Sequence, residues 1–95
     1  MDRGEARAVL TIHLGSFRER SYGDLLSLIG AVQVAQVRGP SGADYQIEVD
    51  VSWDSPREKT NVRVWGTIDG GRLPGALVPV SESFIVAPDG KFVGE

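Results

Sequence analysis

A chain of 95 residues has the length of one domain, and 41% apolar with 24% charged residues is a composition typical of globular proteins. The net charge of −3 and the scattered basic residues argue against nucleic acid as a partner, because binding it requires basic side chains that neutralise phosphates. The lack of cysteine excludes disulfides, thiolate metal sites and cysteine nucleophiles. Residues 1–5 lack the apolar core of a signal peptide, and no apolar run approaches the ~20 residues that span a bilayer. We therefore expect a cytoplasmic protein without a membrane segment.

Residues 5–20 carry two competing periodicities. Apolar residues and one histidine recur at three- and four-residue steps, as on one face of a helix: Ala6, Val9, Leu10, His13, Leu14 and Phe17. Leu10, Ile12 and Leu14 also alternate as in a strand, and a glycine at position 15 costs a helix about 1 kcal/mol relative to alanine. We predict a helix over this segment, with a strand as the alternative.

A short second helix is predicted for residues 21–30. Ser21 is a good N-cap, and Asp24 stands at the third helical position, which is a variant of the capping box. Gly30 occupies the place of a left-handed C-cap. Between them lies an apolar stripe that consists of Leu25, Leu26, Leu28 and Ile29.

From residue 31 onward the apolar period changes to two, which indicates strands. The clearest alternation runs from Tyr45 to Trp53, with apolar residues at the odd positions and polar residues between them. We predict the other strands over residues 32–37, 62–68 and 80–86, and a short final strand at residues 92–93. The connections are a turn at residues 39–42, a polar segment at 54–59, a loop at 72–79 and a turn at 88–91.

These elements predict an α+β fold with one or two N-terminal helices packed on one face of a four-stranded antiparallel meander. The elements form a single domain over residues 1–95, and the second face of the sheet is open to water. The shared phase of the apolar residues predicts a core that includes Leu25, Ile29, Val49, Val51, Val64, Ile68 and Phe84.

A series of motifs covers roughly residues 21–95. They are Ser21-Tyr22-Gly23-Asp24-Leu25-Leu26-Ser27-Leu28-Ile29-Gly30, Gly39-Pro40-Ser41-Gly42, Tyr45-Gln46-Ile47-Glu48-Val49, Trp53-Asp54, Phe84-Ile85-Val86-Ala87-Pro88-Asp89-Gly90 and Phe92-Val93-Gly94-Glu95. This series resembles a small bacterial protein family without an assigned activity. The resemblance favours a helix over residues 5–20, and it carries no cofactor and no functional residue over to this chain.

The residues themselves form no recognisable catalytic or metal-binding pattern. His13 is the only histidine, and its apolar neighbours on the predicted helix favour a position at the boundary of the core. Glu48 and Asp50 share one strand face, where solvated carboxylates are a simpler interpretation than a cation site. The glycines of residues 70–75 precede a strand rather than a helix and lack the P-loop ending. We therefore expect no catalytic residue, no metal site and no cofactor.

Trp65 is the residue that points most directly to a function. If the valines at 62 and 64 face the helices, Trp65 faces water on the open side of the sheet, and pairing of Trp53 with Val62 places Asp50 opposite it. An exposed tryptophan with polar surroundings is typical of an interface anchor. The simpler alternative is a tryptophan that lies over its neighbours or under the loop at residues 72–79. The predicted interaction surface consists of Glu48, Asp50, Arg63, Trp65 and Thr67.

The sequence thus favours a non-catalytic module that binds a protein partner or a second copy of itself. The alternative is a small-ligand site between helices and sheet, with or without an enzymatic activity, lined for example by Tyr22, Tyr45 and His13. A third function, binding of nucleic acid, would require four basic residues to gather on one face. They are Arg57, Lys59, Arg63 and Arg72.

Overall fold

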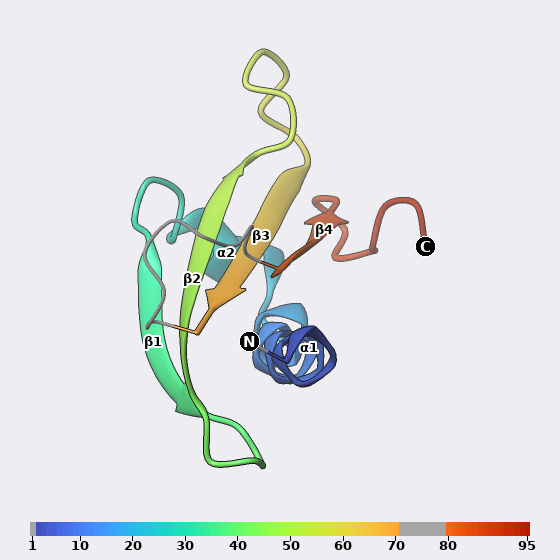
Figure 1. Ribbon diagram of the computed structural model, residues 1–95. Helices are drawn as coiled ribbons and strands as arrows, with labels where there is room; N and C mark the ends of the chain where they lie inside the picture. The colour runs from blue at the N-terminus through green and yellow to red at the C-terminus, as the bar shows by residue number, and fades with distance from the viewer. Residues whose placement is uncertain (1, 71–79) are drawn as a thin grey trace.

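A four-stranded sheet with helices on one side makes up the protein, as seen in a computed structural model that describes residues 2–70 and 80–95. In these residues the chain forms the helices α1 (Arg3–Arg18) and α2 (Tyr22–Leu26) and the strands β1 (Gln33–Arg38), β2 (Asp44–Trp53), β3 (Val62–Asp69) and β4 (Val80–Val86). The strands are antiparallel in the order β1-β2-β3-β4 (Figure 1). The predicted α+β meander is confirmed, and the predicted loop at 72–79 lies outside the described residues.

Helix α1 confirms the helical interpretation of the N-terminal segment. Asp2 caps its first turn by accepting a hydrogen bond from the backbone N–H of Glu5 at 3.0 Å. The helical face is buried as predicted, through Ala6, Val9, Leu10, Leu14 and Phe17. Ile12, which only the strand pattern would have buried, is 78% exposed. None of the described helices is long and apolar enough to cross a membrane.

Helix α2 is shorter than predicted. Ser21 caps it as expected, accepting from the backbone N–H of Asp24 at 3.1 Å, but the helix ends at Leu26 rather than near Gly30. The chain tightens there, because the N–H groups of Leu28 and Ile29 bond to carbonyls three residues back. Leu25 is buried, whereas Ile29 is only partly buried, so its assignment to the core was too strong.

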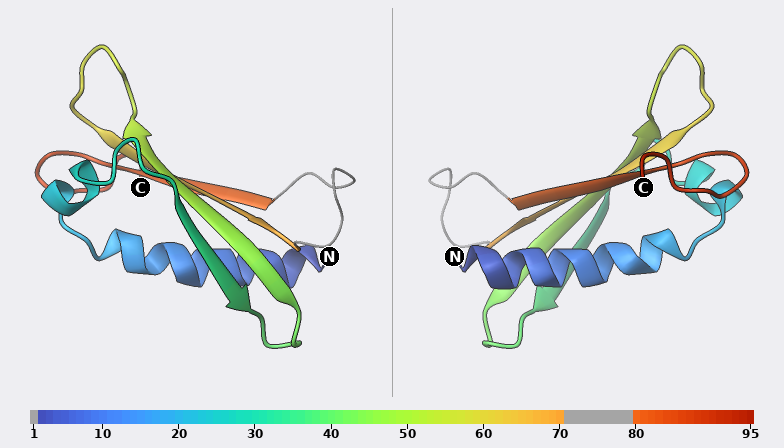
Figure 2. Two further views of the ribbon diagram at one scale, coloured as in Figure 1. Left: turned by 90° about the vertical axis from the view of Figure 1, so that its left-hand side faces the viewer. Right: turned by 90° about the vertical axis from the view of Figure 1, so that its right-hand side faces the viewer.

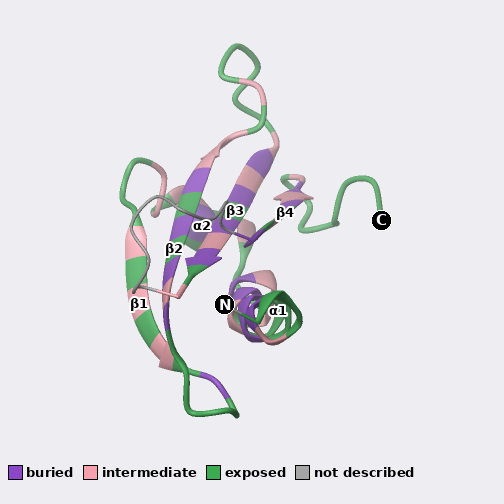
Figure 3. Cartoon of the chain, viewed as in Figure 1, coloured by how far each residue is buried: buried purple, intermediate pink, exposed green. Residues whose placement is uncertain are grey.

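The sheet has the predicted register and alternation. Trp53 pairs with Val62, so that Asp50 lies opposite Trp65. Alternate residues along the three strands β2, β3 and β4 are buried, which gives the striped pattern in Figure 3. The core residues of the sheet are Tyr45, Ile47, Val49, Val51, Val62, Val64, Ile68, Val80, Phe84 and Val86.

The helices cover only part of the inner face of the sheet. Helix α1 packs against β3 and β4, and the five-residue helix α2 against β3. Both described helices lie on the same side, and Figure 2 shows α1 crossing the strands obliquely beneath them. The opposite side of the sheet carries no described helix. This open face is where the sequence places Trp65.

Residues 87–95 fold back onto the end of β4. The predicted final strand is reduced to one bridge between Phe92 and Val86, which follows a tight turn closed by Ala87 and Lys91. The guanidinium of Arg18 lies 4.6 Å and 4.9 Å from the ring centres of Phe84 and Phe92. It also forms a 2.9 Å ion pair with Glu95, whose pKa is lowered mainly by this hydrogen bond.

Candidate functional site

The open face of the sheet brings together all five residues of the predicted interaction surface. Strand β2 contributes Glu48 and Asp50, and β3 contributes Arg63, Trp65 and Thr67. The register places Thr67 opposite Glu48 and Trp65 opposite Asp50. Because side chains alternate between the faces of a strand, these five side chains lie opposite the buried valines that face α1.

Trp65 lies near the middle of this face and is 44% exposed. Its cross-strand neighbours are Asp50 on β2 and Ser83 on β4, which are both small and exposed. Neither neighbour can cover an indole ring. Trp65 therefore leaves a large apolar surface in contact with water at the centre of a polar sheet.

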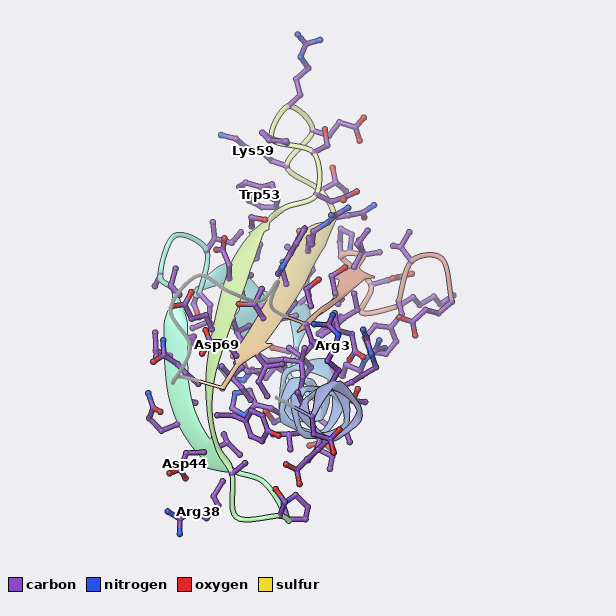
Figure 4. The ribbon with its side chains drawn as sticks, viewed as in Figure 1. Arg3, Arg38, Asp44, Trp53, Lys59 and Asp69 are labelled. Carbon is purple, nitrogen blue, oxygen red and sulfur yellow. The ribbon has the colours of Figure 1, made fainter. Side chains whose placement is uncertain are left out.

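The charge of the open face is predominantly negative. Arg63 is engaged by Asp54, with 3.1 Å between its Nη2 and the carboxylate Oδ1, and its Nε is buried without a hydrogen-bond partner in the described part of the chain. Arg38 and Asp44 form a 2.9 Å ion pair at the hairpin end of β1 and β2 (Figure 4), which raises the pKa of Arg38.

Glu48 and Asp50 remain as exposed carboxylates in the middle of the face. Among residues 2–70 and 80–95 neither forms an ion pair or a side-chain hydrogen bond. The two arginines of the face are already paired with other carboxylates. The centre of the open face therefore offers a tryptophan beside two unneutralised negative charges.

Val32 and Val34 extend the open face beyond the five residues that the sequence predicted. They are 54% and 59% exposed, and Val34 lies opposite Glu48. Strand β1 has valines at positions 34 and 37, which point to opposite faces of the strand. The sequence pattern of β1 therefore does not predict which face is buried. The short turn at residues 39–42 was the available signal, because it ties the phase of β1 to the unambiguous phase of β2.

A groove lies on the helix side of the sheet, between α1 and the end of β1. This groove has a volume of about 400 Å³ and is lined by Val9, Ile12, His13, Val37, Arg38, Gly39 and Pro40. Partial burial lowers the pKa of His13, which favours the neutral imidazole. His13 also lies 5.8 Å from the Phe17 ring, between ring centres.

The two tyrosines predicted to share a ligand site with His13 have structural partners elsewhere. The Tyr45 hydroxyl donates to the Glu5 carboxylate at 2.6 Å, and this bond and burial raise its pKa to about 12. The Tyr22 hydroxyl donates to the backbone carbonyl of Thr60 at 2.6 Å. Of the three residues, only His13 lines the groove, so within residues 2–70 and 80–95 this groove is not a site that His13 shares with the two tyrosines.

The geometry gives little support to the other two candidate functions, metal binding and nucleic-acid binding. In residues 2–70 and 80–95, no three histidine, aspartate or glutamate side chains lie together as a metal site would require. Of the four basic residues considered for nucleic acid, Arg63 is engaged by Asp54, and Arg72 lies outside the described residues. No family model, curated protein or solved structure matches the chain.

Proposed function

We propose that this protein is a non-catalytic interaction module that binds a basic segment of another protein across the open face of its sheet. The observation that carries the proposal is the exposed Trp65 at the centre of this face, directly opposite the unpaired carboxylate of Asp50. Tryptophan is enriched among residues that dominate binding energy at interfaces, because it buries a large area with few rotatable bonds.

The arrangement of Trp65 and Asp50 favours a lysine or arginine side chain as the central contact. Directly opposed residues of an antiparallel pair have Cβ atoms about 4.5–5.5 Å apart. A cationic side chain lying on the indole ring therefore reaches the carboxylate at the same time. A cation over a tryptophan ring contributes about 0.5–2 kcal/mol.

The surrounding residues suit an extended basic segment rather than a single cation. Glu48 adds a second free carboxylate two residues along β2, which matches the side-chain spacing of a strand. Val34 adds an apolar contact beyond Glu48. Charge complementarity of this kind increases the association rate and excludes acidic partners.

The test uses a defined peptide probe, a nine-residue chain of alternating lysine and threonine, with its glutamate counterpart as the control ligand. Fluorescence anisotropy of the labelled peptides should detect binding of the lysine peptide but not of the glutamate peptide. Added salt should weaken the binding of the lysine peptide. Trp65→Ala and Asp50→Asn should each reduce affinity about tenfold or more. Trp65→Ala should cost about 1 kcal/mol of stability or less, as surface changes do.

Matched variants on the helix side control for loss of exposed apolar or charged groups in general. Ile12→Ala removes another exposed apolar side chain, and Glu19→Gln another exposed carboxylate. Both should leave the affinity for the lysine peptide unchanged. Equal binding of the glutamate peptide, or an equal loss in the helix-side variants, would contradict the proposal.

The groove beside His13 supports a second candidate function, binding of a small apolar molecule. The supporting observation is its volume of about 400 Å³ with a lining that is apolar apart from His13 and Arg38. NMR shift mapping with a panel of small aromatic compounds tests this function. Saturable shifts confined to His13, Val37 and Pro40 would support it, and shifts centred on the open face would count against it.

A further inference from the structure

Among residues 2–70 and 80–95, strand β1 has a free hydrogen-bonding edge. It pairs there with β2 alone, because the sheet order places it at one end. The backbone N–H of Gly39 bonds to the carbonyl of Ala43 at 2.8 Å, which sets the alternation of the hydrogen bonds along the hairpin. By that alternation, Val34, Gln36 and Arg38 direct their N–H and C=O groups away from β2.

Most of this edge lacks the features that usually protect an edge strand, and its one charged residue, Arg38, is paired with Asp44 of β2. Residues 32–37, with the sequence Val-Gln-Val-Ala-Gln-Val, contain no charge and no proline. The other edge of the sheet is different. There the bridge from Phe92 to Val86 and the hydrogen bond from Val93 to the carbonyl of Ile85 cover the C-terminal end of β4.

The inner face beneath β1 is also incompletely covered. The inward residues Gln33, Ala35 and Val37 are only half-buried, whereas the inward residues of β2 from Tyr45 to Val51 are buried. Helix α1 packs against β3 and β4, so the groove described above remains open beside β1. Apolar surface and unpaired backbone groups therefore occur together along one border of the molecule.

We propose that two copies of the chain pair antiparallel through β1, about a two-fold axis at Ala35, to form one continuous eight-stranded sheet from two four-stranded ones. This register places Val34 opposite Gln36 of the second copy, so the outward backbone groups of both strands are paired. It also places Val32 opposite Arg38 of the second copy. No two charged residues face each other.

A second copy is the occupant that this edge itself favours. An edge that is neutral apart from Arg38 is self-complementary, because its outward donors and acceptors repeat at the same spacing in both copies. Pairing of β1 with β4 of another copy would instead produce an open chain of molecules. The folded-back C-terminal residues obstruct that pairing at β4.

The two-fold axis also determines which faces of the two copies lie on the same side of the dimer. An axis perpendicular to the sheet keeps both open faces on one side, so the two Trp65 side chains point the same way. The register brings the chain that precedes β1 in the second copy to the hairpin end of β1, where the groove opens. That chain carries the partly buried Leu28 and Ile29.

Strand pairing alone buries an area at the small end of the range for specific complexes, below about 1,200 Å² in total. We therefore expect a reversible dimer that dissociates on dilution. Sedimentation equilibrium of the whole chain over a concentration series should show a transition from monomer to dimer, without larger species. A monomer at all concentrations up to about millimolar would overturn the proposal.

Two variants at position 36 isolate the backbone contribution. Gln36→Pro removes an outward N–H that β2 does not use, so the fold should survive. Gln36→Ala keeps that N–H and loses the same side-chain bond, which joins Gln36 to Gln46 at 3.1 Å. The proline variant should weaken dimerisation at least about tenfold, because symmetry removes the bond twice, and the alanine variant should not. Equal dimerisation of both would overturn the proposal.

Variants with a single cysteine test the register between the two β1 strands directly, because the chain contains no other cysteine. Ala35→Cys should give a disulfide-linked dimer under mild oxidation. Directly opposed residues have their Cα atoms about 4.5–5.5 Å apart, which is within the range of about 4.4–6.8 Å found in most disulfides. Val34→Cys and Gln36→Cys are offset diagonally from their own copies and should link poorly. Equal linking at the three positions would overturn the register. Trp65→Ala should leave the dimer intact, so failure of the open-face proposal and failure of this one are distinguishable.

Discussion

Gly66 offers the sharpest test of how α1 lies on the sheet. It occupies the middle of β3, next to Trp65, and the side it presents to α1 has no room for a side chain. A Cβ atom at this position would lie 2.9 Å from Cδ2 of Leu14 and 3.0 Å from Cδ1 of Leu10. Both leucines are fully buried, so neither can turn away into solvent.

The cost of Gly66→Ala follows from these distances. Carbon atoms in contact prefer about 3.5–4.0 Å, so the leucine methyl groups must retreat by roughly 0.5–1 Å in a packed core. Overpacking of this kind costs about 1–3 kcal/mol, and the better strand propensity of alanine returns about 0.5–1 kcal/mol. We expect a net loss of about 1 kcal/mol, or about 4–8 °C in Tm for a domain of this size.

Gly15→Ala provides a control of opposite sign. Gly15 lies on α1 with no atom within 4 Å of its Cβ position, so alanine gains about 1 kcal/mol of helix propensity without a clash. Differential scanning calorimetry should therefore show a lower Tm for Gly66→Ala and a higher Tm for Gly15→Ala. An unchanged or raised Tm for Gly66→Ala would refute the close packing of α1 on β3. It would also remove the reason why Trp65 is left on the uncovered face.

Three further predictions concern the core, the pH dependence and His13. Val49→Asp should unfold the domain, since an unpaired carboxylate in the core costs several kcal/mol, and an unchanged circular dichroism melt would show the register to be wrong. The bond from Tyr45 lowers the pKa of Glu5, so its contribution to stability is present above pH 4.5 and is lost as pH falls through the lowered value. The same bond raises the pKa of Tyr45 from 10.0 to about 12, so stability falls again as pH rises through that interval. Tyr45→Phe should flatten both limbs of a plot of Tm against pH, and persistence of both would exclude this pair as the cause. His13→Gln should leave peptide binding to the open face within about twofold, and a larger loss in a folded variant would place the binding site in the groove.

Local sequence patterns predicted most of the sheet correctly. The alternation from Tyr45 to Trp53 predicts which side of β2 is buried, because successive side chains of a strand point to opposite faces. The same rule, applied to Val62, Val64 and Ile68, places Trp65 with Asp50 on the open face. The cap of α2 by Ser21 was predicted in the same local manner. The cap of α1 by Asp2 is equally local, but it was not predicted.

The features that the sequence did not predict lie at the ends of the elements, where the chain turns. Arg63 pairs with Asp54 because the chain stays beside β3 after β2 ends, where the N–H of Asp54 bonds to the carbonyl of Asn61. Helix α2 ends at Leu26 because the chain tightens before it enters β1. The C-terminal residues reach the edge of β4 through the rings of Phe92 and Phe84, which lie 5.7 Å apart between centres.

The sequence by itself therefore determined the long helix, the four strands, the buried sides of β2, β3 and β4, and the residues of β2 and β3 that share the open face with Trp65. Those properties are local, since the geometry of a strand or helix assigns each side chain to a side. Only the tertiary structure decided where α1 lies across the sheet, because Gly66 allows close approach at β3 and a single long helix cannot also cover β1. That lateral placement leaves the inner face of β1 half-buried, and no strand of the described part of the chain pairs with its outer edge. The two candidate interaction surfaces thus differ in origin: the alternation of residues along the strands produces one, and the packing of distant segments produces the other.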